Sequence, residues 1–171
     1  MLKKLEIKGF KSIKEMQLEL HALNILIGAN GVGKSNFISL FRLINNIIEQ
    51  NLQLYISQSG GVDSILHFSQ KTTDELFVKL DFGANSYQFS LVPTKDNTLA
   101  FSEEICLFNT PDQDMLGSGH RETKLNNAVK NQDKVACFVA DAIKSWKVYH
   151  FHDTSDSSKM KQLKEIGVSV S

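Results

Sequence analysis

The first 27 residues of the chain place their apolar side chains in an order typical of short strands. Leu5 and Ile7 alternate with lysine and glutamate, and the same period of two returns over residues 16–20. Alternation of this kind predicts strands with one buried and one solvated face. Residues 24–27 (Asn-Ile-Leu-Ile) form a nearly continuous apolar run instead, which predicts a third strand that is buried on both faces.

The middle of the chain predicts a helix followed by a sheet. Apolar residues recur at steps of three and four over residues 34–54, which predicts an amphipathic helix. Glycines and polar residues predict a loop at 57–63. Three alternating runs within residues 75–108, separated by turn residues, predict an antiparallel meander of three strands. Proline, glycine and polar residues then predict a loop over 109–120.

An apolar run near the end of the chain has two interpretations. Residues 135–141 end in aspartate and superficially resemble a Walker B strand. The apolar positions continue to Trp146 at steps of three and four, however, which predicts a helix with Asp141 off its buried face. A final strand is expected over residues 147–151.

The composition is that of an ordinary globular protein and excludes several classes. The chain has 171 residues, 42% of them hydrophobic and 22% charged, which excludes disordered and fibrous chains and suggests one domain. Its 19 basic and 19 acidic residues balance, so net charge gives no argument for nucleic acid or a membrane. Cys106 and Cys137 lie in apolar runs, as core residues of a reducing compartment do. With no membrane-spanning stretch and no secretion signal in the sequence, we expect a cytoplasmic protein without a membrane partner.

One motif in the sequence carries chemistry. Residues 28–35 read Gly-Ala-Asn-Gly-Val-Gly-Lys-Ser and match the P-loop pattern G-x-x-x-x-G-K-[ST]. The glycines let successive backbone N–H groups turn toward one anion, and the following helix adds the positive end of its dipole. In this pattern Lys34 reaches the β- and γ-phosphates of a nucleotide, and the Ser35 hydroxyl binds Mg²⁺. Because an apolar run precedes the motif and a helical period follows it, we predict nucleotide binding.

The first 45 residues resemble the N-terminus of the RecF/SMC/OLD-like ATPases, which are AAA-type ATPases with ABC-like heads. The resemblance rests on Gly-Phe-Lys-Ser-Ile at residues 9–13, on the run 23–37, and on the asparagines that flank the glycine-lysine-serine core. It implies ATP and Mg²⁺ as ligands, with Asn36 beside the α-phosphate and with Lys11 and Ser12 flanking the base or ribose. The nucleotide-binding residues that the motif and the resemblance imply are Lys11, Ser12, Gly28, Asn30, Gly31, Gly33, Lys34, Ser35 and Asn36, with Ser35 on the metal.

The remainder of the sequence lacks the parts that would finish such an active site. It contains no signature serine motif, no apolar strand ending in Asp-Glu and no convincing base, so no catalytic residue is assigned. We therefore expect an α/β fold, a P-loop NTPase with an antiparallel β lobe that forms an incomplete ABC-type head and binds ATP without efficient turnover. The expected organisation is a nucleotide-binding core at 1–56, a β lobe at 57–108, a loop at 109–120, and a helix and strand at 121–171. For the intact ATPase, the resemblance implies a second head as a homodimer partner, and DNA, a nuclease or another effector as a further partner.

Other functions remain open. A non-catalytic module that senses nucleotide or mediates assembly would need no further motif. A GTPase-like switch would use residues 114–117, which fit D-x-x-G but follow a polar loop and have no companion base-reading motif. A small-molecule kinase would need several arginines to clamp phosphates, whereas the chain has only Arg42 and Arg121.

Two further groups of residues have an ordinary explanation beside a functional one. His150, His152 and Asp153 could bind a metal, but a solvated strand end explains them better. The lysines at positions 3, 4, 8, 11 and 14 could follow nucleic-acid phosphates, but a strand edge guarded by lysines is the simpler interpretation.

Overall fold

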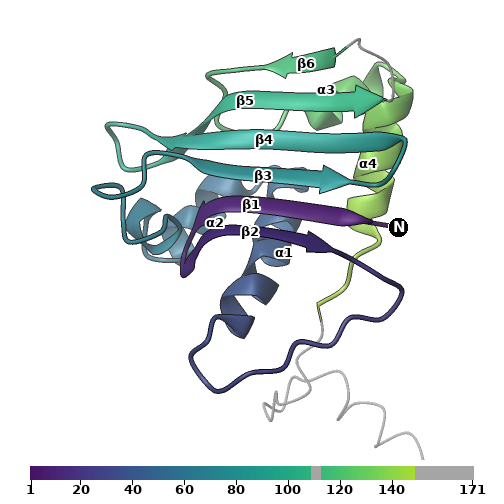
Figure 1. Ribbon diagram of the computed structural model, residues 1–171. Coiled ribbons are helices and arrows are strands. Elements are labelled where there is room, and N and C mark those ends of the chain that lie inside the picture. The colour runs from purple at the N-terminus through teal and green to yellow at the C-terminus, as the bar shows by residue number, and fades with distance from the viewer. Residues whose placement is uncertain (109–112, 149–171) are drawn as a thin grey trace, which may run out of the picture.

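An antiparallel sheet forms one layer of the molecule, and helices cover one of its faces (Figure 1). The computed structural model describes residues 1–108 and 113–148, which contain six strands and four α-helices. The strand order is β2-β1-β3-β4-β5-β6, and every neighbouring pair is antiparallel. The strands are β1 (Lys4–Phe10), β2 (Ile13–Glu19), β3 (Leu76–Asp81), β4 (Asn85–Pro93), β5 (Leu99–Phe108) and β6 (Gln113–Gly117). The helices are α1 (Lys34–Ile48), α2 (Leu52–Gln58), α3 (Leu125–Lys130) and α4 (Lys134–Lys144), with a 3-10 turn η1 (Val62–Ser64).

Alternating side chains build the sheet as the sequence predicts. In β1, Leu5 and Ile7 are buried, whereas the charged residues that alternate with them, Lys4, Glu6 and Lys8, lie on the opposite face. Strand β3 repeats this strict alternation, and β4 pairs with β3 and β5 on either side. The first two predicted strands and the predicted meander are therefore confirmed.

The hydrophobic core lies between the sheet and the helices. Its largest fully buried side chains are Tyr87, Phe10, Phe89, Phe101, Leu5, Ile7, Leu40, Leu43, Ile44, Ile47, Ile48 and Leu52. Burying one such aliphatic or aromatic side chain contributes about 1.5–3 kcal/mol. Helix α1 provides five members of that set, so the helix that starts at the P-loop motif is anchored along its length.

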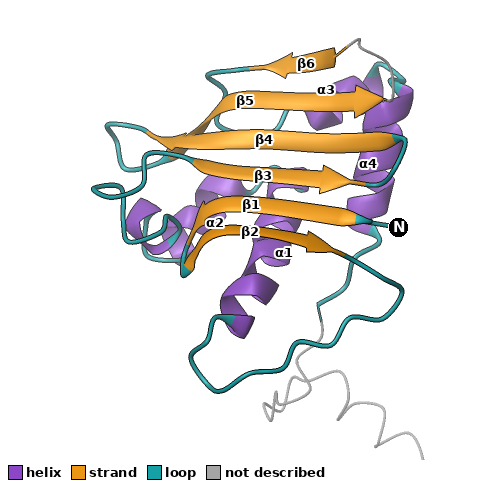
Figure 2. Cartoon of the chain, viewed as in Figure 1, coloured by secondary structure: helices purple, strands orange, loops and turns teal. Residues whose placement is uncertain are grey.

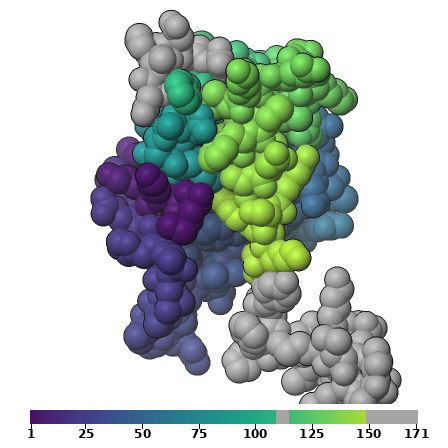
Figure 3. Space-filling view, turned by 90° about the vertical axis from the view of Figure 1, so that its right-hand side faces the viewer, coloured from purple at the N-terminus to yellow at the C-terminus, as the bar shows by residue number. Residues whose placement is uncertain are grey.

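The predicted third strand is wrong. Residues 24–27 form part of a long loop between β2 and α1, which swings away from the sheet (Figure 2) and projects from the body of the molecule (Figure 3). Leu23, Ile25 and Ile27 are 77%, 73% and 90% exposed. A strand buried on both faces needs a neighbour on each side and apolar cover, and the described strands offer this segment neither.

The predicted helix over residues 34–54 is two helices. Helix α1 ends at Ile48, and the chain turns at Gln50, whose φ of 58° is left-handed and cannot continue a helix. The Glu122 carboxylate accepts hydrogen bonds from the N–H groups of Leu52 and Gln53, both at 3.0 Å, and so caps α2. Because this cap comes from a residue 70 positions away, no local pattern could reveal the break. Helix α2 also continues into the predicted 57–63 loop, which then closes through η1.

The last third of the described chain holds one confirmation and two corrections. The helix predicted over 135–146 is confirmed as α4, and Asp141 is exposed on it, which rules out a Walker B strand there. The predicted 109–120 loop is wrong in part, because β6 pairs along β5 within it. Helix α3 was not predicted. Residues 147 and 148 form no strand, and the rest of the strand predicted at 147–151 lies outside the described residues.

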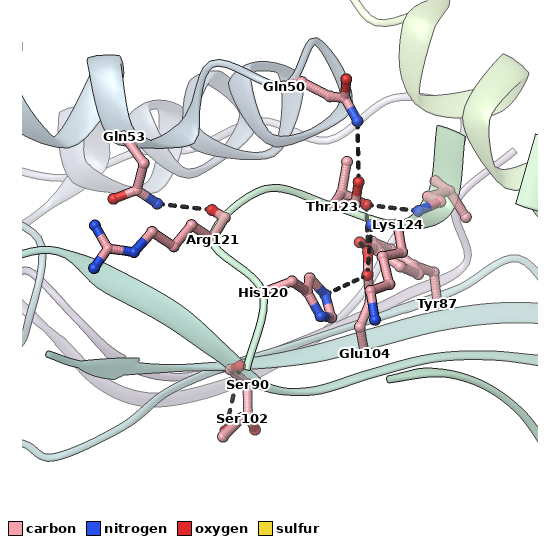
Figure 4. Close-up of polar contacts among 11 residues, drawn as sticks. Gln50, Gln53, Tyr87, Ser90, Ser102, Glu104, His120, Arg121, Thr123 and Lys124 are labelled. Atoms are coloured by element: carbon pink, nitrogen blue, oxygen red, sulfur yellow. Dashed lines mark hydrogen bonds and ion pairs between the residues drawn. The ribbon is translucent and has the colours of Figure 1, made fainter. Parts of the chain in front are cut away.

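A buried polar network joins the sheet to the helix layer (Figure 4). The Glu104 side chain is fully buried on β5 and accepts hydrogen bonds from the Tyr87 hydroxyl at 2.6 Å, the Lys124 N–H at 2.9 Å and the Thr123 hydroxyl. The His120 Nε2 lies 2.8 Å from the same carboxylate. Burial and the neighbouring Glu104 charge raise the pKa of Tyr87 well above its ordinary value, so its hydroxyl keeps its proton and donates. The network therefore fixes the segment 120–124 between the sheet and the α1–α2 junction.

Candidate nucleotide-binding site

The P-loop motif forms an open turn that leads directly into α1. Gly31 and Gly33 adopt left-handed φ values of 88° and 99°, and Gly33 is the residue that precedes the first turn of the helix. Within the part of the chain that the structure covers, no side chain caps this turn, and it contains no acidic residue. The N–H groups of the turn and the positive end of the helix dipole therefore face a position suited to an anion.

Lys34 is folded back over the loop that precedes it. Its ammonium group donates to the carbonyl oxygens of Gly28, at 2.5 Å, and Ala29, at 2.7 Å. These two hydrogen bonds hold the Lys34 ammonium beside the turn instead of leaving the side chain extended into solvent. An anion enclosed by the turn would meet this ammonium directly.

The turn between β1 and β2 meets the P-loop from the other side. The Asn36 side-chain amide donates to the Ser12 hydroxyl at 2.8 Å. A Cβ atom added at Gly33 would lie 2.9 Å from the same hydroxyl oxygen, closer than side chains tolerate. Ser12 and Asn36, which the sequence places 24 positions apart, are thus in contact beside Gly33.

Two hollows lie against this turn, and both are electropositive. The first, of about 350 Å³, is lined by Asn30, Gly31, Gly33, Lys34, Ser35 and Asn36. The second, of about 870 Å³, lies beyond Ser35 and has an apolar wall of Ile38, Phe41 and Trp146 together with Lys34, Arg42 and Lys147. Among residues 1–108 and 113–148, no carboxylate lines either hollow. The surroundings therefore suit a polyphosphate, and Ser35 lines both hollows.

Lys11 adds a further positive charge at the edge of this region. Its ammonium lies 5.6 Å from the centre of the Phe10 ring. Burial lowers the pKa of Lys11, and the nearby Arg42 charge lowers it further. Two cations held close together repel each other, and an anion between them would relieve that repulsion.

Sequence reasoning missed three residues of this region. Arg42 and Trp146 line the larger hollow, and His67 holds the β1–β2 turn through the Lys11 carbonyl. Helical periodicity could have placed Arg42 near Ser35 and Ser39 on α1, because residues three, four and seven apart share a face. No sequence signal connects Trp146 or His67 to the P-loop.

Several alternative sites receive no support from the structure. The D-x-x-G residues 114–117 lie on β6, at the opposite edge of the sheet from β2, which leads into the P-loop. Lys4 pairs with Glu19 at 3.2 Å and Lys8 with Glu15 at 3.3 Å, so glutamates of β2 balance these two lysines of the basic N-terminus. In the described ranges, no three histidine, cysteine or acidic side chains converge as metal ligands. His150, His152 and Asp153 lie outside those ranges.

Comparison with known families decides the class of protein. A sequence model of the AAA ATPase domain matches residues 1–166. The chain belongs to the AAA ATPase domain family. Membership implies that this AAA ATPase domain binds ATP, typically with Mg²⁺, which agrees with the cation-lined turn described above. No curated protein sequence matches the chain. None of the helices that the structure describes is long and apolar enough to cross a membrane.

Proposed function

We propose that the chain is the ATP-binding N-terminal part of a RecF/SMC/OLD-like ATPase with an ABC-like head. The observation that carries the proposal is the Lys34 ammonium, held over a left-handed glycine turn at the start of α1. The N–H groups of that turn would bind the β- and γ-phosphates together with Lys34, and the Ser35 hydroxyl would hold Mg²⁺. Asn36 would contact the α-phosphate, and Lys11 and Ser12 would flank the ribose or base. Gly28 and Asn30 would shape the turn.

We further propose that hydrolysis needs a C-terminal half that is not within these residues. Phosphoryl transfer requires an acidic residue near Mg²⁺ and a polar group that orients the attacking water. No described carboxylate lines the hollows beside Ser35, which supports this view. The exposed apolar run at 23–27 supports it independently, because strands from a C-terminal half would give that run the neighbours that the described strands do not provide.

The partners of the intact ATPase follow from the same proposal. A second head would complete the site as a homodimer, and the cycle would act on DNA, a nuclease or another effector. The alternative is a non-catalytic module that senses nucleotide or mediates assembly. Absence of turnover even after addition of the C-terminal half would favour this alternative.

Binding of ATP and GTP to three proteins tests the proposal: wild type, Lys34→Ala, and Lys130→Ala as a control. Lys130 is an exposed lysine at the end of α3, so its loss should leave affinity unchanged. Loss of the Lys34 ammonium should weaken ATP binding about 10- to 100-fold, as expected for a charge-assisted contact. Equal binding by wild type and Lys34→Ala would refute the P-loop assignment, and a strong preference for GTP would refute the proposed family.

A further inference from the structure

The turn between β1 and β2 is held from behind by the segment 65–67. The Lys11 N–H donates to the Ile65 carbonyl at 2.9 Å, and the His67 N–H donates to the Gly9 carbonyl at 3.0 Å. Between these bonds, Phe10 and Leu66 form an isolated antiparallel bridge. The segment therefore extends the pairing of β1 at the point where β1 ends and the turn that meets the P-loop begins.

His67 adds a side-chain contact to this pairing. Its Nδ1 lies 2.6 Å from the Lys11 carbonyl oxygen, and the residue is 8% exposed. A carbonyl oxygen can only accept, so Nδ1 carries the hydrogen. The imidazole packs edge-on against the Phe68 ring, with 4.3 Å between the two ring centroids, and the Thr73 hydroxyl donates to the His67 backbone carbonyl at 2.5 Å. The hydrogen bond to Lys11 and the Phe68 ring therefore orient the imidazole, and Thr73 holds the backbone that carries it.

Lys11 needs such a restraint. Its φ is 47°, a left-handed conformation that residues with a Cβ atom rarely adopt without external contacts. The Lys11 carbonyl belongs to the same planar peptide unit as the Ser12 N–H, so fixing the carbonyl fixes the direction in which Ser12 leaves the turn. Ser12 in turn receives the Asn36 amide and lies over Gly33. One peptide unit therefore separates His67 from the P-loop contacts.

We propose that His67 is a positioning residue of the ATP site, which acts through the Lys11 carbonyl to hold Ser12 against Asn36 and Gly33. The inference rests on the proposed ATP site at the P-loop. His67 itself makes no contact with the nucleotide in this scheme. Its effect on affinity passes through Ser12.

A double-mutant cycle between His67→Phe and Ser12→Ala tests the inference. Phenylalanine keeps the ring and its packing but removes the donor, so Mg²⁺-ATP affinity should fall about fivefold to tenfold. Ser12→Ala should cause a similar loss, and the double variant should bind no more weakly than the weaker single variant. His67→Asn offers an amide hydrogen at the same place and should restore affinity to within about twofold of wild type. Unchanged affinity of His67→Phe, multiplicative losses or failure of the asparagine rescue would each overturn the proposal.

A measurement on the wild-type protein covers the case in which a His67 variant does not fold. Nitrogen NMR should find His67 with its hydrogen on Nδ1, and addition of Mg²⁺-ATP should shift that Nδ1 resonance. A hydrogen on Nε2 alone, or no shift at saturating ATP, would overturn the inference. The outcome also separates this inference from the proposed function. If wild type binds ATP and Lys34→Ala does not, the proposed ATP site stands whether or not His67 positions it. If Lys34→Ala binds ATP as tightly as wild type and His67 also has no effect, the proposed site itself is refuted.

Discussion

The P-loop region and the network around Glu104 hold charge in opposite ways. The Glu104 carboxylate is fully buried, and four groups from β4 and the segment 120–124 surround it at hydrogen-bond distance. The Lys34 ammonium has two backbone carbonyls as partners, in an open loop whose apolar side chains face solvent. The Glu104 carboxylate is fully paired inside the protein, whereas the Lys34 ammonium can still donate to an anion.

The difference separates the part of the fold that carries stability from the part suited to binding. A buried charge is tolerated only when it is paired and hydrogen-bonded, so the packed sheet and helices depend on a complete set of partners for Glu104. A binding site has the reverse requirement, because a site already satisfied by the protein has nothing left to offer a ligand. The cations near Lys34, and the hollows beside it that no described carboxylate lines, meet that requirement.

Removal of the Glu104 carboxylate should have the largest effect on stability. Glu104→Ala leaves the Tyr87 hydroxyl, the Thr123 hydroxyl and the Lys124 N–H without their acceptor, so we expect a loss of about 3–5 kcal/mol in the free energy of unfolding. Urea denaturation at neutral pH measures it. The matched control is Glu103→Ala, which removes the neighbouring, partly exposed carboxylate and should cost less than about 1 kcal/mol. Equal losses would show that the buried network stabilises the fold no more than the partly exposed Glu103 does.

Gly33→Ala should have a smaller effect on stability and a large one on ATP affinity. A Cβ atom there combines a left-handed φ of 99° with a 2.9 Å approach to the Ser12 hydroxyl, and we expect about 1–2 kcal/mol of destabilisation. Gly31→Ala is the control, because it has a similar φ of 88° but no described atom within 4 Å of the added Cβ. Calorimetric titration with Mg²⁺-ATP should show a greater loss for Gly33→Ala than for Gly31→Ala. Identical losses would exclude a role for the Ser12 contact.

Truncation of Ile27 should barely change stability. Ile27 is 90% exposed, so Ile27→Ala should stay within about 0.5 kcal/mol of wild type. Ile7→Ala, at a fully buried position of β1, should cost about 2–5 kcal/mol. Thermal and urea unfolding of both variants test the pair. A loss above 2 kcal/mol for Ile27→Ala would mean that the 23–27 run is buried in solution. The P-loop region would then not be the open counterpart of the buried Glu104 network.

The sequence predicts the local elements of this fold well. The sequence shows a period of two in β1 and β3–β5 and a helical period in α4. Each period arises because the apolar side chains on one face of the element pack into the core. The same local patterns wrongly favour residues 24–27 as a buried strand. An apolar run indicates that burial would be favourable, but it does not indicate whether neighbouring strands are present to bury it. The P-loop residues are predicted for a different reason, since the chemistry of phosphate binding fixes their spacing, and their binding role stays a prediction.

What the sequence could not predict depends on contacts between distant segments. Glu122 caps the start of α2 from 70 residues away, and Glu104 is buried by partners from β4 and from beyond β6. His67 reaches Lys11 across 56 positions. Each of these is a polar side chain that meets a backbone or side-chain group of another segment, and no periodicity records such a meeting.

The exposed pair of Asp96 and Arg121 gives the smallest effect and the finest test of the comparison. The Thr94 hydroxyl donates to Asp96 at 2.6 Å, the Arg121 guanidinium lies 2.7 Å from it, and together they lower the pKa of Asp96 to about 2. Because the folded-state pKa is depressed, the stabilising contribution is present above the ordinary value of 3.8 and is lost as the pH falls through about 2. Carboxyl carbon NMR should show this low pKa, with Thr94→Val raising it more than Arg121→Ala. If solvent exposure alone set the pKa of Asp96, neither variant would change it. Depth of burial, and not the set of partners, would then explain the contrast between Glu104 and Lys34.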